Sequence, residues 1–343
     1  MSKENGTAAV YVQTNEAAAN RVIAFRRNED GALEQLGGFE TGGAGSGVPH
    51  LPSQGSVVLT GDGRHLLVTN AASDDVSVLA VAAGGLKLLQ TLPSGGTAPT
   101  SVAERDGLVY VLNAGEPSLV GFRLDAAGLA PLPGSRRDLA PDADPAQAGF
   151  APDGSKVVVT ERGTNSIAVY AVRDDGTLAE PEVTPSSGPT PYGFAFAGES
   201  ALVVTEAFGA QKGKAAASSY VLANGSAAPV SRSVGNGRSE ICWAVATKDG
   251  RHVFTTNFAD GAVSRYAIGT DGGLVLADAA AGVAVDGETG LRDEDLSADG
   301  RFLYAIDADS GRIFGWAVDE KGSLSPIGAW AGVPPTVAGL AAS

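Results

Sequence analysis

The sequence is poor in the residue types that cross-link chains or bind transition metals. Among its 343 residues there are one cysteine, Cys242, and three histidines. A lone cysteine cannot form an intrachain disulfide, and the Cys/His spacing of zinc sites does not occur. A Gly-rich phosphate loop before a helix and a nucleophilic Ser elbow are also absent. We therefore expect no resident cofactor and no metal.

Positive charge and long apolar runs are scarce too. Lys and Arg number 24 against 39 Asp and Glu, which gives a net charge of −15. Nucleic acids and anionic membranes attract proteins through Lys and Arg, so we expect neither as a partner. No run of about 18 apolar residues could span a bilayer. The expected protein is a soluble monomer.

The N-terminal residues contain no apolar stretch of the kind that a secretory signal requires. The sequence enters a strand pattern by Val10. As written it is expected in the cytoplasm, or outside it if a signal peptide was removed.

Glycine and proline are abundant instead, with 47 and 18 copies, which favours many short strands joined by turns. One phrase recurs seven times: a β-rich run ending in Asn, Glu or Asp, a short polar loop, then a second alternating run. The end residues of the first run are Asn15, Asn70, Asn113, Glu161, Glu206, Asn257 and Asp307. Their spacing of roughly 40 to 55 residues is the period of four-stranded propeller blades.

Residues 145–182 show the unit most clearly. Strand A (PAQAGFAP) is followed by the pair Asp153-Gly154, then by strand B (KVVVT), strand C (SIAVYAV) and the start of strand D. Asp-Gly is the pair preferred in type I′ hairpin turns, so we expect that turn between strands A and B. The pair recurs in four other units, as Asp62-Gly63, Asp106-Gly107, Asp249-Gly250 and Asp299-Gly300.

The two ends of the sequence each hold part of one unit. The first unit offers only strands B, C and D, and an orphan strand A begins near Pro335. Pairing the two fragments removes the open sheet edges that would otherwise promote aggregation. The sequence therefore predicts an all-β fold: one seven-bladed β-propeller domain over residues 1–343, with four-stranded antiparallel blades. We expect its C-terminal strand A to close the ring against the N-terminal strands B, C and D.

Strand position assigns residues to the two faces of such a ring. Strand A lines the channel, so the D–A and B–C loops share one face, which we call the loop face. The A–B and C–D turns form the other, the turn face. His65 and His252 follow A–B turns and fall on the turn face. His50 lies in a D–A loop, where it is a candidate general base or an ordinary loop residue.

Carboxylates and arginines are interleaved on the loop face. Arg238 precedes Glu240 by two residues, and Arg292 precedes Glu294 in the same way. In an extended strand both members of each pair point the same way, towards the channel mouth. The arginines could then bind an anionic substrate while Glu240 and Glu294 move a proton, or the pairs are structural. Three further candidates for substrate binding share this face, namely Arg162, Glu161 and Glu206.

Neutral polar and aromatic side chains stand at other starts of strand A. Gln54, Gln147 and Tyr192 look towards the channel, where they suit hydrogen bonds to a sugar-like or lactone ligand, or to buried water. Cys242 is either a reactive thiol beside Trp243, which would serve as an aromatic platform for a ligand, or a small core residue. The acidic and amide groups at the ends of strand B could bind calcium, but they lie one layer away from the channel.

Two repeats carry a family resemblance. PDGSKVVVTERGTNSIAVYAVRDDGTL and SADGRFLYAIDADSGRIFGWAVDEKGSL resemble the blades of the propeller lactonase family. That family includes 6-phosphogluconolactonase-like proteins and carboxymuconate lactonizing enzymes. The resemblance covers all seven units, and it implies a His, an Arg and a Glu at the channel mouth. The matching positions here carry Gln54, Thr100, Gln147, Tyr192, Glu240 and Glu294.

Three functions follow as hypotheses. The first is a lactonase-like enzyme that acts on a sugar or carboxylate lactone, with arginines as anchors and a carboxylate as acid/base. The second is a noncatalytic propeller that binds a protein, a glycan or a small ligand. The third is a muconate-type lactonizing isomerase. Propellers host many functions, so the fold alone does not separate them. The expected partner of the enzyme is a small lactone or sugar acid.

Overall fold

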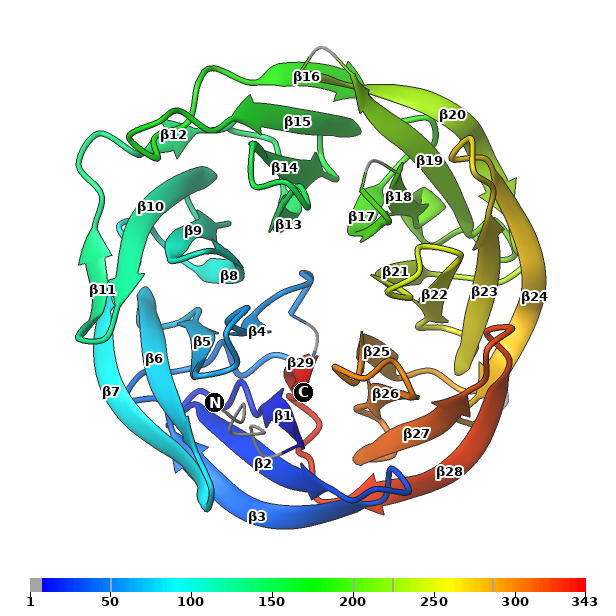
Figure 1. Cartoon of the computed structure of the whole chain (residues 1–343), viewed down its shortest axis with the longest axis horizontal. Coiled ribbons are helices and arrows are strands. Elements are labelled where there is room, and N and C mark those ends of the chain that lie inside the picture. Colours follow the sequence, from blue (N-terminus) through cyan, green and yellow to red (C-terminus); the bar gives the residue numbers. More distant parts are fainter. Residues whose placement is uncertain (1–7, 50, 200, 224, 286) are drawn as a thin grey trace, which may run out of the picture.

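The computed structural model describes residues 8–343 except 50, 200, 224 and 286. The described strands form seven antiparallel sheets, arranged as blades around a central axis (Figure 1). In six of these sheets neighbouring strands follow the chain order, and blade three carries a fifth short strand, β12 (Arg137–Asp138), paired with β10 (Ser118–Asp125). This confirms the predicted fold class. Within the described part of the chain, no helix is long and apolar enough to cross a membrane.

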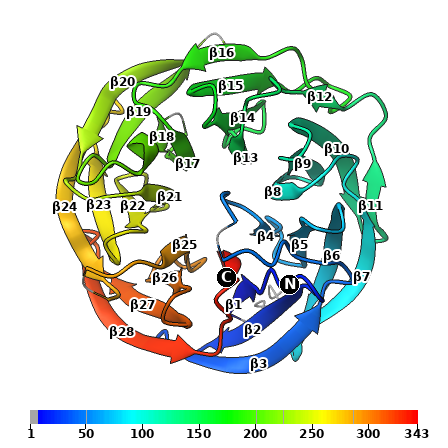
Figure 2. The same cartoon turned by 180° about the vertical axis from the view of Figure 1, so that it is seen from behind.

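The strands of each blade lie one outside the other from the axis to the rim, as Figures 1 and 2 show from opposite sides. The inner strands, in blade order, are β29 (Ala338–Ala342), β4 (Val57–Leu59), β8 (Pro99–Arg105), β13 (Pro145–Phe150), β17 (Pro191–Ala197), β21 (Ile241–Ala246) and β25 (Leu291–Leu296). The second strands are β1 (Ala9–Gln13), β5 (His65–Asn70), β9 (Leu108–Asn113), β14 (Lys156–Glu161), β18 (Ala201–Glu206), β22 (His252–Asn257) and β26 (Phe302–Asp307).

The third and outer strands complete the blades. The third strands are β2 (Arg21–Arg27), β6 (Asp75–Ala82), β10 (Ser118–Asp125), β15 (Ser166–Ala171), β19 (Ala216–Ala223), β23 (Ala262–Ile268) and β27 (Arg312–Val318). The outer strands are β3 (Leu33–Glu40), β7 (Gly85–Pro93), β11 (Gly128–Pro131), β16 (Glu182–Pro185), β20 (Ser226–Gly235), β24 (Leu274–Val283) and β28 (Leu324–Ala331). One 3₁₀ turn, η1 (Phe208–Ala210), follows β18.

Alternating apolar residues on the strands fill the seams between blades. Successive side chains of a strand point to opposite faces of its sheet. In β14, Val157 and Val159 pack against blade three while Val158 packs against blade five. The described residues form one such buried cluster in each of the seven seams. The core is therefore a ring of seam clusters.

The ring is closed by the predicted pairing of the two chain ends. β29 pairs antiparallel with β1, with Val10 opposite Ala342 and Tyr11 opposite Ala341. The strand begins three residues later than Pro335, because the N–H of Val337 bonds to the carbonyl of Pro334 in a turn. Blade one thus has strand order β29-β1-β2-β3.

The expected type I′ turns are found at one Asp-Gly pair. Asp106 and Gly107 both have positive φ, 50° and 78°, as that turn requires. In the other four pairs only the glycine has positive φ, so the prediction was wrong there. The aspartate instead caps a longer loop, because its side chain accepts the N–H of the residue two positions on, as Asp62 does from Arg64 at 2.9 Å.

Candidate functional site

The inner strands of blades three to seven share a defect near their loop-face ends. In each, the pairing with the second strand shifts register just after the first paired residue. Such a bulge turns a side chain out of the regular alternation, and bulges are common next to active sites. The residues at these bulges are Thr100, Ala146, Tyr192 with Gly193, Cys242, and Arg292 with Asp293.

Aromatic and cationic side chains gather around three of these bulges. The Tyr192 and Trp243 rings meet edge to face with centroids 5.6 Å apart. The guanidinium of Arg162 lies 5.1 Å from the Tyr192 ring centre, and that of Arg292 lies 5.4 Å from the Phe258 ring centre. These contacts, with the carboxylates described below, define the mouth cluster: Arg162, Tyr192, Glu240, Cys242, Trp243, Phe258, Arg292 and Asp293.

Both arginines of the mouth cluster are held in place. Arg162 follows β14, and its Nη2 pairs with the Asp144 carboxylate at 2.5 Å. Arg292 is 2 % exposed, and its Nη1 donates to the Val337 carbonyl at 3.4 Å. Its Nε has no partner among the described residues. Burial lowers the pKa of this guanidinium, while Asp293 opposes that change. Arg292 therefore retains an unused hydrogen-bond donor.

Glu240 supplies the accessible carboxyl group of the cluster. It immediately precedes β21 in a left-handed conformation, with φ 54°, and is half-buried. Partial burial raises the pKa of its carboxyl group, and the negative charge of Asp260 raises it further. A carboxyl group with a raised pKa in a partly exposed position suits proton transfer.

Four charged groups of the cluster act on the pKa of the Cys242 thiol. Burial raises the pKa of this thiol, as do Glu240 and Asp293, whereas Arg162 and Arg292 lower it. The net rise leaves a buried, protonated thiol, which is a poor nucleophile. Burial likewise raises the pKa of the Tyr192 hydroxyl well above its usual value. The Tyr192 hydroxyl has no hydrogen-bond partner among the described residues, so it is a free neutral donor.

The expected side-by-side orientation of the arginine and glutamate pairs was wrong. Glu240 is left-handed rather than extended, and Arg238 turns outward to donate to the Ala279 carbonyl of β24 at 3.2 Å. In β25, Arg292 and Asp293 lie between the paired residues Leu291 and Glu294, where the register shifts. The bulge breaks the two-residue alternation, so Arg292 and Glu294 have different surroundings.

Two predicted binding residues, Glu161 and Glu206, lie at the ends of second strands with local partners. Glu161 accepts hydrogen bonds from the hydroxyls of Thr164 and Ser166. Glu206 is fully buried and accepts from the N–H of Gly188 and from two serine hydroxyls. These bonds tie B–C and D–A loops to the blade. Neither carboxylate belongs to the mouth cluster.

The glutamines Gln54 and Gln147 bond to backbone groups of other blades. Gln147 exchanges hydrogen bonds with the backbone of Phe194 in the next blade. Gln54 reaches across to β21, where it donates to the Ala244 carbonyl at 2.8 Å and accepts its N–H at 3.1 Å. The Trp243 indole donates to the Ser53 carbonyl beside it. The segment before β4 therefore crosses the middle of the ring (Figure 1).

Glu294 lies further along β25 and lines a cavity of about 380 Å³ inside the ring, together with Gln54 and Gln147. It is 5 % exposed, and burial raises its pKa well above the usual value. The backbone of Thr256 lowers the pKa and so offsets part of this rise. Its contact with the carboxyl group is not a well-formed hydrogen bond to either oxygen. Glu294 thus lies beneath the mouth cluster and not in it.

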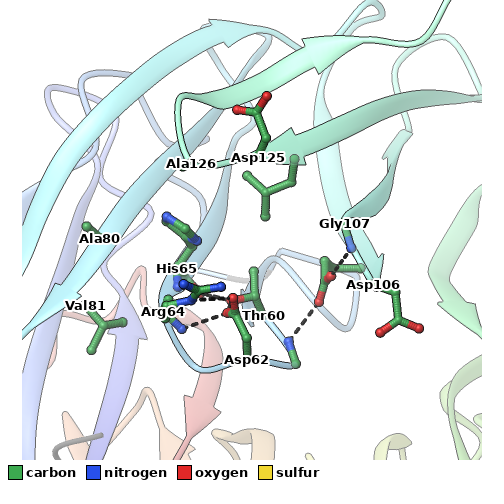
Figure 3. A pocket seen from close by; sticks show the side chains of 13 residues that line it. Thr60, Asp62, Arg64, His65, Ala80, Val81, Asp106, Gly107, Asp125 and Ala126 are labelled. Atoms are coloured by element: carbon green, nitrogen blue, oxygen red, sulfur yellow. Dashed lines mark hydrogen bonds and ion pairs between the residues drawn. The ribbon is translucent and has the colours of Figure 1, made fainter. Parts of the chain in front are cut away.

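The histidines give no support to a site in the described structure. His50 lies outside the described residues. His65 lines a cavity of about 560 Å³ on the turn face between blades two and three (Figure 3). There Asp62 binds Arg64, and Glu104 caps the N–H groups of two turns. Among the described residues, no group of three His, Cys, Asp or Glu side chains could hold a metal ion.

Three residues that matter at the mouth were not predicted: Phe258, Asp144 and Asp260. Phe258 and Asp260 follow β22 in a B–C loop, and Asp144 precedes β13. Their position on the loop face was a signal, because loops on a rigid scaffold often carry sites. Their convergence depends on the bulges, which the repeat pattern does not reveal.

The comparison with protein families decides the family. The family described as "Lactonase, 7-bladed beta-propeller" matches residues 4–130, 127–207 and 203–337. The chain belongs to this lactonase family. No curated protein matches the sequence.

Solved structures similar to this lactonase-family chain share its fold at low identity. A putative 6-phosphogluconolactonase from Bacteroides fragilis is 18 % identical with a TM-score of 0.74, over 100 % of this chain and 99 % of that one. A periplasmic gluconolactonase from Pseudomonas aeruginosa is 17 % identical with a TM-score of 0.75, over 98 % of both chains. A functionally unknown protein from Desulfotomaculum acetoxidans is 13 % identical with a TM-score of 0.75, also over 98 % of both. Identities this low establish the fold and leave the activity open.

Proposed function

We propose that this chain is a lactone hydrolase whose active site is the mouth cluster, with a sugar or carboxylate lactone as substrate. The observation that carries the proposal is the position of Glu240. Its carboxyl group is half-buried with a raised pKa, and its charge acts on the Cys242 thiol together with those of Arg162 and Arg292. Membership of the lactonase family supports the same reaction class.

The reaction needs one base and one oxyanion donor. Glu240 removes a proton from water as the water oxygen attacks the lactone carbonyl carbon. The free Nε of Arg292 and the neutral Tyr192 hydroxyl are donors for the oxyanion that forms. Collapse breaks the ring C–O bond, and the proton passes from Glu240 to the released alkoxide. The product is a hydroxy acid.

Arg162 is the proposed anchor for an anionic or hydroxyl-rich part of the substrate. Its guanidinium lies over the Tyr192 ring and is oriented by Asp144, which accepts from Nε at its backbone carbonyl and from Nη2 at its carboxylate. A fixed guanidinium binds carboxylates and other planar anions with two hydrogen bonds. The stacking fixes the cation before substrate arrives, so little side-chain entropy is lost on binding.

A panel of sugar and muconate lactones tests the assignment by pH-stat titration. We expect hydrolysis of at least one lactone, and Arg162→Gln should raise KM for it about tenfold with a smaller change in kcat, since the anchor acts mainly in binding. Arg136→Gln, at an exposed arginine elsewhere, is the matched control and should leave both constants within about twofold. No turnover with any lactone, combined with a ligand-dependent rise in melting temperature, would favour the noncatalytic alternative. Isomerisation of muconate without hydrolysis would favour the third.

Asp260 should set the pH dependence of the reaction. Its negative charge raises the pKa of Glu240, so Asp260→Asn should lower that pKa. The base must be ionised to act, and the acid limb of kcat/KM should therefore move to lower pH. Asp260→Glu, which keeps the charge, should leave the limb near its original pH. An unshifted limb in Asp260→Asn would remove Glu240 as the base.

A further inference from the structure

A cavity of about 560 Å³ lies on the turn face between blades two and three, and it takes no part in the proposed reaction (Figure 3). Ligand pockets measure roughly 300–1,000 Å³, so its volume suits a ligand. On the side of blade two it is lined by Arg64 and by His65, the first residue of β5. On the side of blade three it is lined by Asp125 and Ala126, where the chain turns from β10 to β11. The cavity therefore separates turns of two neighbouring blades.

The turn at Arg64 belongs to a motif that occurs three times in the chain. Blades two, six and seven each carry Asp-Gly-Arg followed by an aromatic side chain, which begins the second strand of the blade. In each copy the aspartate accepts the arginine N–H, at 2.9, 3.1 and 3.1 Å respectively. The three copies therefore share one local structure. Their aromatic residues are His65, His252 and Phe302.

In blade six the motif holds a turn of the next blade. The Nη2 of Arg251 donates to the Glu320 carbonyl at 3.2 Å. Gly322, two residues on, packs directly on the imidazole of His252, because a Cβ atom at Gly322 would lie only 2.7 Å from a ring carbon. The arginine and the ring therefore act together as a receptor for a short turn that contains glycine.

Blade seven repeats this arrangement with the turn of blade one. The Nη2 of Arg301 donates to the Glu29 carbonyl at 3.3 Å. Gly31, again two residues on, packs on the Phe302 ring, where a Cβ atom would lie 2.5 Å from a ring carbon. Two copies of the motif thus bind the same kind of turn through the same two contacts.

In blade two the same motif has no such turn against it. The C–D turns of blades seven and one each leave five residues, 319–323 and 28–32, between the third and outer strands. In blade three, β10 and β11 stay paired up to Asp125 and Gly128, so the turn is only residues 126–127. Within the described part of the chain, the Arg64 side chain hydrogen-bonds to Asp62 alone, through Nε at 2.7 Å. The cavity therefore lies where the other two motifs hold a glycine turn.

The charges around the cavity favour a basic turn. Four carboxyl groups line it against one guanidinium, that of Arg64. Each carboxylate has about four lone-pair sites, so the partners that these groups already have leave capacity for another donor. The turn held by blade six has Lys321 directly before its glycine. The four carboxyl groups and their partners are Asp62 with Arg64, Glu104 with the N–H groups of Gly61 and Gly107, Asp106 with Arg105, and Asp125 with the N–H of Ala127.

We propose that this cavity binds a Lys-Gly turn on the surface of a partner protein. The glycine of the turn packs on His65, and the carbonyl two residues before it accepts from the free Nη2 of Arg64. The lysine ammonium group lies among the carboxyl groups of Glu104, Asp106 and Asp125. The site is on the opposite face from the mouth cluster, and the proposal does not depend on lactone hydrolysis.

A small cyclic peptide tests the proposal on the unaltered protein. The probe is Cys-Asp-Ala-Lys-Gly-Ser-Cys, closed by its disulfide and labelled with a dye, which copies residues 319–323 with Ala in place of Glu320. We expect saturable binding by fluorescence anisotropy, with Kd below about 1 mM, since one turn buries little surface. A probe with Asn in place of its glycine should bind about tenfold more weakly or worse, because Asn tolerates positive φ but brings a side chain against the ring. A probe with Glu in place of its lysine should lose as much through repulsion.

Two matched variants test the receptor. Arg64→Ala removes an exposed side chain, so the fold should be kept, and it should weaken binding of the lysine probe about fivefold or more, because the carbonyl loses its donor. Arg251→Ala alters the same motif in blade six, whose turn is already in place, and should leave the affinity unchanged. Glu240→Gln, at the mouth cluster, should leave it unchanged too.

The proposal is overturned by the absence of saturable binding, or by equal affinity for the glycine and asparagine probes or for the lysine and glutamate probes. Undiminished affinity in folded Arg64→Ala would also overturn it. A dimer seen by sedimentation equilibrium and lost in Arg64→Ala would assign the cavity to a second copy of this chain and so overturn the partner assignment. Absence of lactone turnover in the unaltered protein would affect only the proposed function.

Discussion

Replacing Glu240 by Gln is expected to lower kcat/KM for lactone hydrolysis at least 100-fold. General acid–base groups contribute roughly 10²- to 10⁴-fold to enzymatic rates, and the amide cannot accept the proton from water. The fold should survive, because Glu240 is half-buried and its structural bonds use its backbone carbonyl, which accepts the N–H of Phe258 at 2.9 Å. The measurement is initial-rate kinetics by pH-stat, with circular dichroism to verify folding.

The matched control for this variant is Glu116→Gln. Glu116 lies on the same loop face between β9 and β10, with its side chain 68 % exposed and only a loose contact to Arg136. Its loss should change kcat/KM by less than twofold. If Glu240→Gln retains full activity in a folded protein, the base lies elsewhere and the mouth cluster loses its assigned role.

Deleting residues 338–343 is expected to destabilise the protein by at least ~5 kcal/mol, and so to prevent a sharp unfolding transition near that of the full chain. The deletion removes the inner strand of blade one and exposes the edge of β1. An unpaired edge can pair with another chain, so aggregation should increase. The deletion also removes Leu340 from the seam between blades seven and one, and the Ala342 N–H that Asp295 accepts. Thermal unfolding followed by circular dichroism measures the effect.

A synthetic peptide of residues 334–343 provides the control for the deletion. Added in excess, it should pair with β1 and restore much of the melting temperature, because it supplies the missing strand and its side chains. A peptide with the same residues in scrambled order should not. A truncated chain that melts within about 2 °C of the full chain would show that blade one does not need β29.

The blade architecture was predictable because its determinants are local and repeated. The β-branched run of β14 (KVVVTE) and the apolar run of β15 (SIAVYA) indicate strands without reference to distant residues. The turn residues between strands and the orphan strand near the C-terminus do the same for their own structure. The closure followed from counting strands. One copy of the strand phrase predicts a blade only weakly, and the agreement of seven copies makes the prediction strong.

The site was less predictable because it depends on departures from the repeat. A bulge in β25 places Arg292 over Phe258, although the alternating pattern pairs it with Glu294. The left-handed conformation of Glu240 separates it from Arg238 in the same way. That these residues lie on the loop face was predicted from their position in the loops alone. Their mutual contacts arise from one or two backbone angles that composition and periodicity do not encode.

The seven seam clusters have a consequence for how the ring opens. Each second strand contributes side chains to the seam on either side of it, so separating one seam loosens the packing of two blades at once. In a closed ring, no blade has a free side from which fraying could begin. Backbone amides of the second strands should therefore exchange with solvent deuterium at similar rates in all seven blades, governed by one global opening rather than by a gradient from either chain end.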